Sequence, residues 1–355
     1  MSITVFASPP LTGAARGAHL GRSLGPEVRA TWDAYARLFS DLGLADGLVR
    51  DVGARALDAV AAWAPGLAEE ILGIAEGAAL EPWQAAALNA RSEVLGHVRQ
   101  PLPGECSTAA YSPPDGTAPR TVQTWDWYES MDGVKLIWQY SPAPGRTVKT
   151  FTEYGILAKI GVSDAGLGVH FNLLQHERDG GTGGVPVHLV ARRVLDEAAT
   201  LDEAEEIARS ATVTASVALT VVTRQGARCL ELSPAGLAVV PARPDGLSLH
   251  TNHFLDATLA RGERLGPTDP DTYARHAALT DRAEALKSQT ATIRAVALLQ
   301  HREQGAALCC HPVPDAPDEP RWQTLITITL DPARGALAFH DGTPCTVTPH
   351  SWTRV

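Results

Sequence analysis

The chain has 355 residues, of which 45% are hydrophobic and 20% charged, as in an ordinary globular protein with a sizeable core. Its net charge of −10 argues against binding to nucleic acid or to an anionic membrane surface. No apolar run in the sequence reaches the roughly 18 residues that a membrane-spanning helix needs. We therefore expect a globular protein with neither kind of partner.

The cysteine pattern favours a reducing compartment. The five cysteines are Cys106, Cys229, Cys309, Cys310 and Cys345. They are odd in number and form no Cys-x-x-Cys pair, which indicates free thiols rather than a disulfide framework. Residues 1–10 lack the basic and long apolar stretches of a secretory signal. These features predict a cytoplasmic protein.

The first hundred residues are predicted to be mainly helical. A glycine-rich stretch at 13–21 lacks the preceding strand and the Gly-Lys-Ser/Thr of a phosphate loop, so no nucleotide site is expected there. Apolar residues then recur at intervals of three and four, which is typical of a helix: Val28, Trp32, Tyr35, Phe39 and Leu42. Further helices are expected near 57–71 and 81–96. A breaker cluster at 100–104 ends this helical part.

Beyond residue 106 the hydrophobic period changes to the alternation of strands. Strands are predicted at 121–127, 134–140, 147–154, 158–162, 168–174, 215–223, 227–232, 237–240, 247–251, 325–330 and 336–340. Helices are predicted at 186–196, 202–210, 271–287 and 292–300. Blocks of helices and blocks of strands indicate an α+β protein, and two antiparallel sheets between helical layers would accommodate this order.

A single cysteine lies where the helical part meets the first strand, in the sequence Pro-Gly-Glu-Cys-Ser-Thr-Ala-Ala-Tyr at 103–111. Taken alone, Cys106 is typical of a small buried residue that opens a strand. Its place at the change of periodicity makes it the first candidate for a nucleophile.

Several stretches resemble the acyl-CoA:6-aminopenicillanic acid acyltransferase family, the self-processing N-terminal-nucleophile (Ntn) hydrolases of peptidase family C45. Among them are Gly-Glu-Cys-Ser-Thr at 104–108, Gln-Thr-Trp-Asp-Trp at 123–127 and His-Thr-Asn-His-Phe at 250–254. The others are residues 16–17 and 21, 88–91 and 93, 161–167 and 172, 184–189, 231–234, 324–331 and 341–345. Their shared order and spacing carry the resemblance over most of the chain.

The resemblance implies a four-layer αββα Ntn-hydrolase sandwich in a single domain, made as a precursor and cut between Glu105 and Cys106. An α-chain of residues 1–105 and a β-chain of residues 106–355 would then form one fold. A thiol needs a base to become a nucleophile, and the freed α-amine, which titrates near 7.7–8, is suited to that task. Nucleophile and base would belong to the same residue.

The resemblance also assigns roles to three polar residues. Asp126 matches an aspartate that contacts the new amine, although a strand-end carboxylate is the structural alternative. Asn252 matches the asparagine that donates to the oxyanion, a large term in catalysis, and otherwise would be a turn asparagine. Asn172 is a second polar candidate for the oxyanion or the substrate, with a hydrogen bond across a hairpin as its alternative.

Other side chains suggest further sites. Trp125 and Trp127 could line an apolar acyl pocket, although aromatic strands more often belong to the core. His253, a possible substrate contact, and His250 suggest a Cys–His dyad, which the α-amine would make unnecessary. The Cys-Cys-His sequence at 309–311 suggests zinc, but adjacent cysteines chelate one ion poorly and no second ligand pair stands at finger-like spacing. We therefore expect no metal.

Two positions depart from the family pattern. Glu105 stands where the family usually has glycine, which best accommodates the strained carbonyl needed for self-cleavage. Cys310 stands where family members often carry an arginine implicated in catalysis or carboxylate binding. The first departure bears on the rate of processing, and the second makes a bound substrate carboxylate doubtful.

The sequence therefore predicts a self-processing amidohydrolase or acyltransferase that acts through a Cys106 thioester and needs no cofactor. Its partner would be a small-molecule acyl amide or acyl thioester. The open substrate classes are a penicillin or N-acyl amine, a β-alanyl amide and a peptide natural product. The alternative is a relative that is never cut and binds a small molecule or a protein without catalysis.

Overall fold

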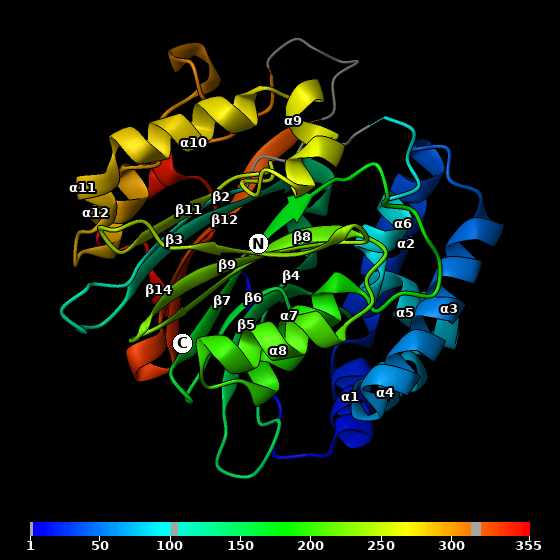
Figure 1. Ribbon diagram of the computed structural model, residues 1–355. Coiled ribbons are helices and arrows are strands. Elements are labelled where there is room, and N and C mark those ends of the chain that lie inside the picture. The colour runs from blue at the N-terminus through cyan, green and yellow to red at the C-terminus, as the bar shows by residue number, and fades with distance from the viewer. Residues whose placement is uncertain (1–2, 101–105, 314–320) are drawn as a thin grey trace.

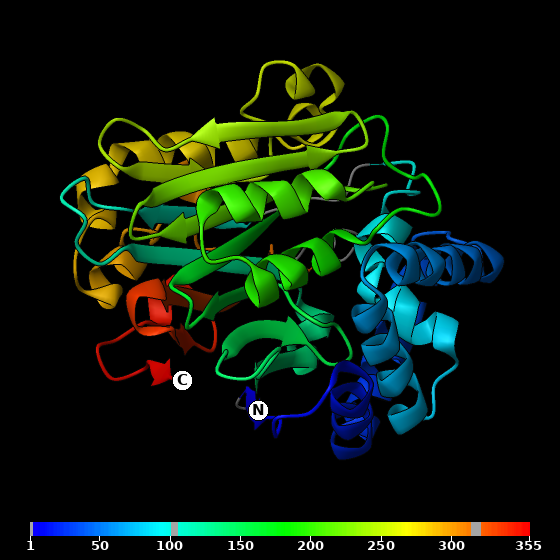
Figure 2. The same ribbon diagram turned by 60° about the horizontal axis from the view of Figure 1, so that its bottom comes forward.

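The computed structural model describes residues 3–100, 106–313 and 321–355, which form two stacked β-sheets between helical layers (Figures 1 and 2). Helices α10 to α12 cover the outer face of one sheet, and helices α7 and α8 cover the other. The N-terminal helices form a separate block beside the sheets. The predicted αββα sandwich is thus confirmed, with this flanking block in addition.

Eight strands of the described residues form the larger sheet. In spatial order they are β1 (Thr4–Ala7), β4 (Lys135–Tyr140), β5 (Val148–Glu153), β6 (Ile160–Ser163), β7 (Leu167–Leu174), β8 (Ser216–Thr223), β9 (Gly226–Ser233) and β10 (Gly236–Pro241). Neighbours are antiparallel except for β1 and β4, which are parallel. The expectation of a purely antiparallel sheet is therefore wrong at this edge, because the sequence analysis did not identify β1.

Six strands form the smaller sheet, and all its neighbouring pairs are antiparallel. In spatial order they are β11 (Leu247–His250), β2 (Ser107–Tyr111), β3 (Arg120–Tyr128), β12 (Trp322–Asp331), β13 (Ala336–His340) and β14 (Thr353–Arg354). Strand β2 begins directly after Cys106. A bulge between Thr324 and Ile326 interrupts the pairing of β12 with β3.

The N-terminal block is helical as predicted, but it holds six helices where three were expected: α1 is additional, the helix expected near 57–71 is divided at Ala64, and the one near 81–96 is divided at Ala90. Its helices are α1 (Gly13–Ser23), α2 (Gly25–Asp41), α3 (Asp46–Trp63), α4 (Pro65–Ala78), α5 (Pro82–Asn89) and α6 (Arg91–Leu95). Helix α1 occupies the glycine-rich stretch because its glycines let it approach α4 closely. A Cβ at Gly17 would lie 2.0 Å from the carbonyl oxygen of Glu70, and one at Gly73 would lie 2.3 Å from that of Ala14.

The remaining helices cover the sheets. They are α7 (Val187–Glu197), α8 (Leu201–Ser210), α9 (Leu265–Thr268), α10 (Asp271–Asp281), α11 (Ala283–Leu286) and α12 (Ala291–Val296). The helix predicted over 271–287 is divided at Arg282 into α10 and α11, and α12 ends before residue 300. Helix α8 begins at a capping box formed by Thr200 and Glu203.

One main core joins the N-terminal block to both sheets, since Leu20, Trp125, Leu219 and Leu325 belong to the same buried cluster. A second cluster lies beneath α10 to α12. Among the residues that the structure describes, no helix is both long and apolar enough to cross a membrane.

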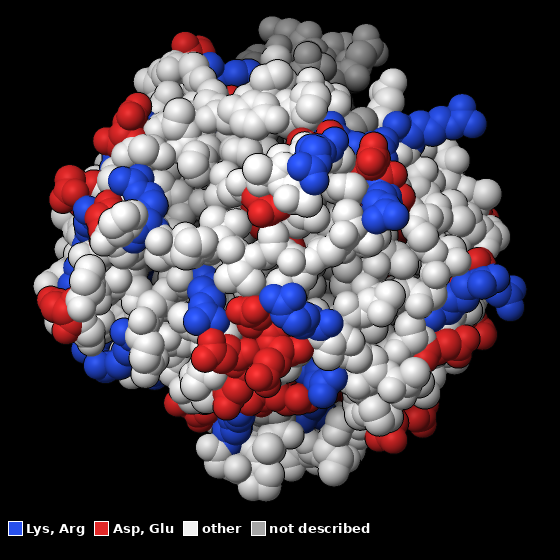
Figure 3. Space-filling view, in the orientation of Figure 1, with Lys and Arg blue, Asp and Glu red and all other residues white. Residues whose placement is uncertain are grey.

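Charges of both signs are spread over the molecular face shown in Figure 3. Acidic side chains gather over α8, where Glu205 pairs with Arg209 and Arg228. Basic side chains on this face stand singly or beside acids, in keeping with the acidic net charge.

Candidate active site

Cys106 lies at the start of β2 with 6% of its surface exposed. Two buried side chains hold its backbone carbonyl. Nδ2 of Asn172 donates to this oxygen at 3.1 Å, and Nη1 of Arg275 donates to it at 3.0 Å. Cys106 is therefore held by both sheets: it adjoins β2 of the smaller sheet, and Asn172, which bonds its carbonyl, belongs to β7 of the larger sheet.

A small cavity with about 20 Å³ of free space lies against Cys106, between β3 of one sheet and β7 of the other. Its walls are Arg91, Cys106, Trp125, Asp126, Trp127, Lys159, Phe171, Leu173 and Asn252. Three consecutive residues of β3, Trp125 to Trp127, border the cavity. They pair with β12 at its bulge, and a bulge changes the direction of neighbouring side chains, so residues of one strand that would otherwise alternate between faces can border the same space. The cavity thus collects the predicted Cys106, Asp126 and Asn252 together with both tryptophans.

The amide of Asn252 has a fixed orientation. Its Nδ2 donates to the carbonyl of Leu173 at 2.8 Å, and its Oδ1 accepts from Nη2 of Arg275 at 3.2 Å. Its backbone N–H donates to Oγ1 of Thr272 at 2.9 Å. The second N–H of Nδ2 has no partner within the described ranges, so one neutral donor on the cavity wall remains for a bound group.

Arg275 in α10 is a site residue that the sequence analysis missed. It is fully buried, and its Nε donates to Oδ2 of Asp271 at 2.9 Å. Its Nη1 also donates to Oγ of Ser107 at 3.2 Å, besides the contacts with Cys106 and Asn252. The Asp–Arg pair four residues apart in a predicted helix was visible, but nothing in the sequence linked it to the cysteine.

Burial and the nearby carboxylate of Asp126 raise the pKa of the Cys106 thiol to about 12. Asp126 itself is fully buried, and Oγ1 of Thr124 donates to its Oδ2 at 3.4 Å. In the continuous chain the thiol is therefore protonated near neutral pH and is a poor nucleophile.

A buried ionic cluster forms part of the cavity wall. The carboxylate of Glu153 accepts from Arg91 at 3.1 Å and from Lys159 at 2.5 Å, and it also contacts the hydroxyl of Tyr35. Nζ of Lys159 lies 3.8 Å from the centre of the Trp125 ring. Burial and the charge of Arg91 lower the pKa of Lys159 to about 7, so this cation titrates near neutrality.

Other predicted candidates lie off the cavity wall. Asn172 contacts the carbonyl of Cys106, as described above. His253 is buried beside Thr272, and burial followed by the charges of His250 and His276 lowers its pKa to about 3. His250 uses its two ring nitrogens on Thr251 and Glu231, which does not favour a Cys–His dyad. Glu105 lies outside the described residues.

The sequence model of the acyl-coenzyme A:6-aminopenicillanic acid acyl-transferase family matches residues 122–343. This match covers more than half of the chain, which therefore belongs to that family. The 40 kDa form of the acyl-coenzyme A:6-aminopenicillanic-acid-acyltransferase from Emericella nidulans is 33% identical over 209 residues. This stretch is 59% of the present chain and 57% of that protein, so little more than half of the relative is matched.

Among solved structures, penicillin V acylase from Agrobacterium tumefaciens is 18% identical with a TM-score of 0.47, over 70% of this chain and 86% of that one. The Caenorhabditis elegans orthologue of N-acylethanolamine-hydrolyzing acid amidase is 13% identical with a TM-score of 0.45, over 64% and 93% of the two chains. These scores are low, and the family assignment rests on the family model alone.

Proposed function

We propose that the protein is a cysteine Ntn amidohydrolase or acyltransferase that cuts its own precursor between Glu105 and Cys106 and then acts on a small-molecule acyl amide or acyl thioester. The observation that carries this proposal is the single cavity that brings Cys106, Asp126 and Asn252 together from three separate segments. Family membership and the name of the Emericella nidulans relative both support acyl chemistry.

The electrostatics support activation by chain cleavage. In the continuous chain the nitrogen of Cys106 is an amide, which is no base, and the buried thiol has a pKa of about 12. Cleavage would replace this amide by an α-amine that titrates near 7.7–8. The carboxylate of Asp126, which disfavours a thiolate before cleavage, would then stabilise the adjacent ammonium and thereby the thiolate–ammonium pair.

The reaction follows from these positions. Sγ of Cys106 attacks the acyl carbonyl, and the free N–H of Asn252 donates to the oxygen that gains negative charge. The α-amine takes the thiol proton and gives it to the leaving amine or thiolate as the carbonyl bond to that group breaks. Water or an acceptor amine then attacks the thioester, returns a proton to Sγ and releases the acyl product. Arg275 acts as a positioning residue for the carbonyl of Cys106 and the amide of Asn252.

The cavity walls favour a small apolar acyl group. Trp125, Trp127, Phe171 and Leu173 are apolar members of the wall. The free space of about 20 Å³ holds little more than one water molecule, so a bound acyl group would need these side chains to move apart.

Intact-mass spectrometry of freshly purified protein, beside a Cys106→Ala variant, tests self-processing. We expect two fragments, 1–105 and 106–355, from the native sequence and one full-length chain from the variant. Incubation with short N-acyl amines followed by peptide mapping should then find the acyl group on Cys106. A single full-length chain in both samples, with no acylation, would instead favour the alternative of an uncut binding protein.

An Asn252→Ala variant tests the proposed role of Asn252 as the oxyanion donor. If Asn252 stabilises the oxyanion, the variant should lose about 100- to 1,000-fold in kcat. An Asn89→Ala variant is the matched control, since Asn89 is equally buried but, among the described residues, its side chain bonds only Ala85, Gly155 and Leu157. It should lose stability while the activity of the folded fraction is retained.

A further inference from the structure

Four side chains outside the catalytic cavity form a compact cluster of metal-ligand type. One ligand atom each of His301, Cys309, His311 and Cys345 lies within 4.8 Å of all the others. Sγ of Cys309 and Sγ of Cys345 both lie 3.4 Å from Nε2 of His311. The rings of His301 and His311 are 5.1 Å apart between their centres.

This geometry is close to that of a tetrahedral zinc site. Zinc bonds of about 2.3 Å to sulfur and about 2.0–2.1 Å to nitrogen place neighbouring ligand atoms roughly 3.3–3.8 Å apart. Both sulfur–nitrogen distances of 3.4 Å fall within that range. The widest separation, at most 4.8 Å, would close by about 1 Å through side-chain rotation.

We propose that His301, Cys309, His311 and Cys345 bind one Zn²⁺ ion in a Cys2His2 site. From the sequence we expected no metal, because Cys309 and Cys310 are adjacent and no second ligand pair stands at finger-like spacing. The fold supplies the missing pair from a distance: His301 precedes η3 (Arg302–Gln304), and Cys345 lies in η5 (Pro344–Thr346). Cys310, the neighbour that made the pattern look unsuitable, lies outside the cluster.

The surroundings of two ligands support the assignment. Nε2 of His301 is buried and has no hydrogen-bond partner in the parts of the chain that the structure describes, whereas Nδ1 lies 3.6 Å from the carboxylate of Glu303. This separation is longer than a hydrogen bond, and a small rotation of the exposed Glu303 side chain would bring it to the other ring nitrogen, where zinc-bound histidines commonly have a carboxylate. Cys345 is an exposed free thiol, a reactive group that metal ligation would protect.

Four protein ligands leave no open position, so the site is structural rather than catalytic. The ion would join the segments before η3, before β12 and after β13. Next to Cys309, the backbone N–H of Cys310 donates to Oγ1 of Thr324 at 3.1 Å, and Thr324 pairs with Asp126 of β3. Zinc would therefore fix the strand that lies beside Asp126, whatever reaction the cavity performs.

Metal analysis of the reduced full-length protein tests the proposal. We expect about one zinc per chain in the protein as isolated and, after chelation, uptake of about one Co²⁺ per chain. The cobalt form should show thiolate charge-transfer bands and the intense visible absorption of tetrahedral coordination, and Zn²⁺ should displace it. Added Zn²⁺ should also raise the melting temperature of the chelated protein.

Cys345→Ser and His311→Asn should lose this metal, whereas Cys310→Ala and His350→Asn, which alter a neighbouring thiol and an exposed histidine, should retain one equivalent. Because a ligand variant could fail to fold, Glu303→Gln keeps all four ligands and should bind zinc about 10-fold more weakly. The proposal is overturned if wild type binds under about a tenth of an equivalent, if its cobalt spectrum is octahedral, or if Cys309 and Cys345 are found as a disulfide.

Discussion

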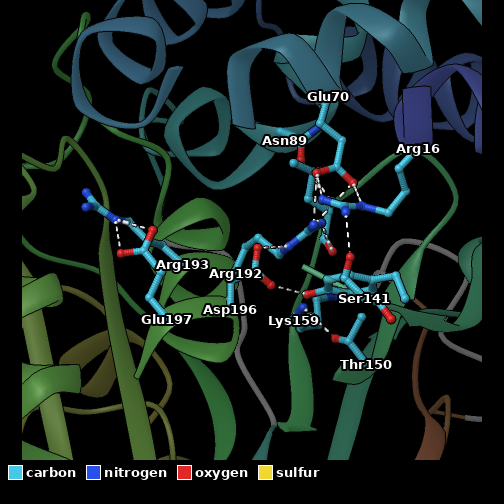
Figure 4. A network of polar contacts seen from close by, with 12 residues as sticks. Arg16, Glu70, Asn89, Ser141, Thr150, Lys159, Arg192, Arg193, Asp196 and Glu197 are labelled. Atoms are coloured by element: carbon cyan, nitrogen blue, oxygen red, sulfur yellow. Dashed lines mark hydrogen bonds and ion pairs between the residues drawn. The ribbon is translucent and has the colours of Figure 1, made fainter. Parts of the chain in front are cut away.

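Two buried carboxylates, Glu70 and Glu153, each gather cations, but only one of the two clusters borders the cavity. Glu70 in α4 accepts from Arg16 of α1 at 2.6 and 2.7 Å and from Arg192 of α7 at 2.9 and 3.2 Å (Figure 4). Glu153 at the end of β5 pairs with Arg91 and Lys159, both of which line the cavity. Both carboxylates are fully buried.

The difference lies in whether the partners titrate. Both cations around Glu70 are arginines, which stay charged in proteins, and the cluster joins the N-terminal block to α7 across the sheet edge. The Glu153 cluster contains Lys159, whose pKa is lowered to about 7 by burial and by Arg91. The scaffold cluster thus has a fixed charge, whereas the cluster at the cavity can change its charge near neutral pH.

The largest effect is expected for Glu70→Gln. Removing this charge leaves the buried Arg16 without a counter-charge and Arg192 with Asp196 alone, which should lower the free energy of unfolding by about 3–5 kcal/mol. Urea denaturation measures the loss. The activity of the remaining folded protein should not change, because Glu70 does not line the cavity. A loss below about 1 kcal/mol would show that the cluster does not hold the block in place.

Glu153→Gln should cost less, about 1–3 kcal/mol, because Lys159 can release its proton and leave Arg91 as the only uncompensated cation. The same urea series compares the two variants. Without Glu153 the pKa of Lys159 falls further, so we expect the deficit of Glu153→Gln to shrink as the pH rises towards 7 and to stay level above it, whereas that of Glu70→Gln should stay constant. Equal losses with equal pH dependence would contradict the distinction between the two clusters.

Local sequence signals predicted much of this molecule. Period and turn residues identified most strands and helices, and the junction at Cys106 led to Asp126 and Asn252, which do share one cavity. Helix α1 was missed because its glycines, which disfavour an isolated helix, are required by the packing against α4. The short strand β1 carries no alternation long enough to detect.

The missing parts of the site depend on long-range contacts. Arg275 meets Cys106 across 169 residues, and Lys159 meets Glu153 only because β5 and the segment before β6 are adjacent. The zinc ligand Cys345 stands 34 residues from His311. Single charged or sulfur-containing residues follow no periodic pattern in the sequence, so these long-range contacts can be identified only in the folded structure.

A Lys159→Met variant tests the titrating cation directly. In the folded protein the pKa of Lys159 is about 7, below the roughly 10.4 of an unfolded lysine, so the unfolded state holds more protons between these values. The wild type should therefore gain about 1–2 kcal/mol of stability as the pH rises from about 7 to about 8.5. The variant lacks this group and should show a flatter profile.

Urea midpoints across that pH range measure the slope. Lys149→Met on β5 is the matched control, because Lys149 is partly exposed and lies outside the Glu153 cluster. It should keep the slope of the wild type. If Lys159→Met also kept it, the titration near the cavity would belong to another group.

The smallest loss of stability is expected for Glu197→Gln, which removes the partner of Arg193, the residue after Arg192 in α7. Arg193 pairs with Glu197 through Nε at 3.0 Å to each carboxylate oxygen, but the two side chains are 25% and 53% exposed (Figure 4). Water and salt screen this pair, and Arg193 also keeps its contact with the Trp63 ring. Glu197→Gln should therefore cost under about 0.5 kcal/mol, less still at high salt, as measured by the same urea midpoints. A loss as large as that of Glu70→Gln would mean that the number of charges near α7, rather than their burial, decides the stability.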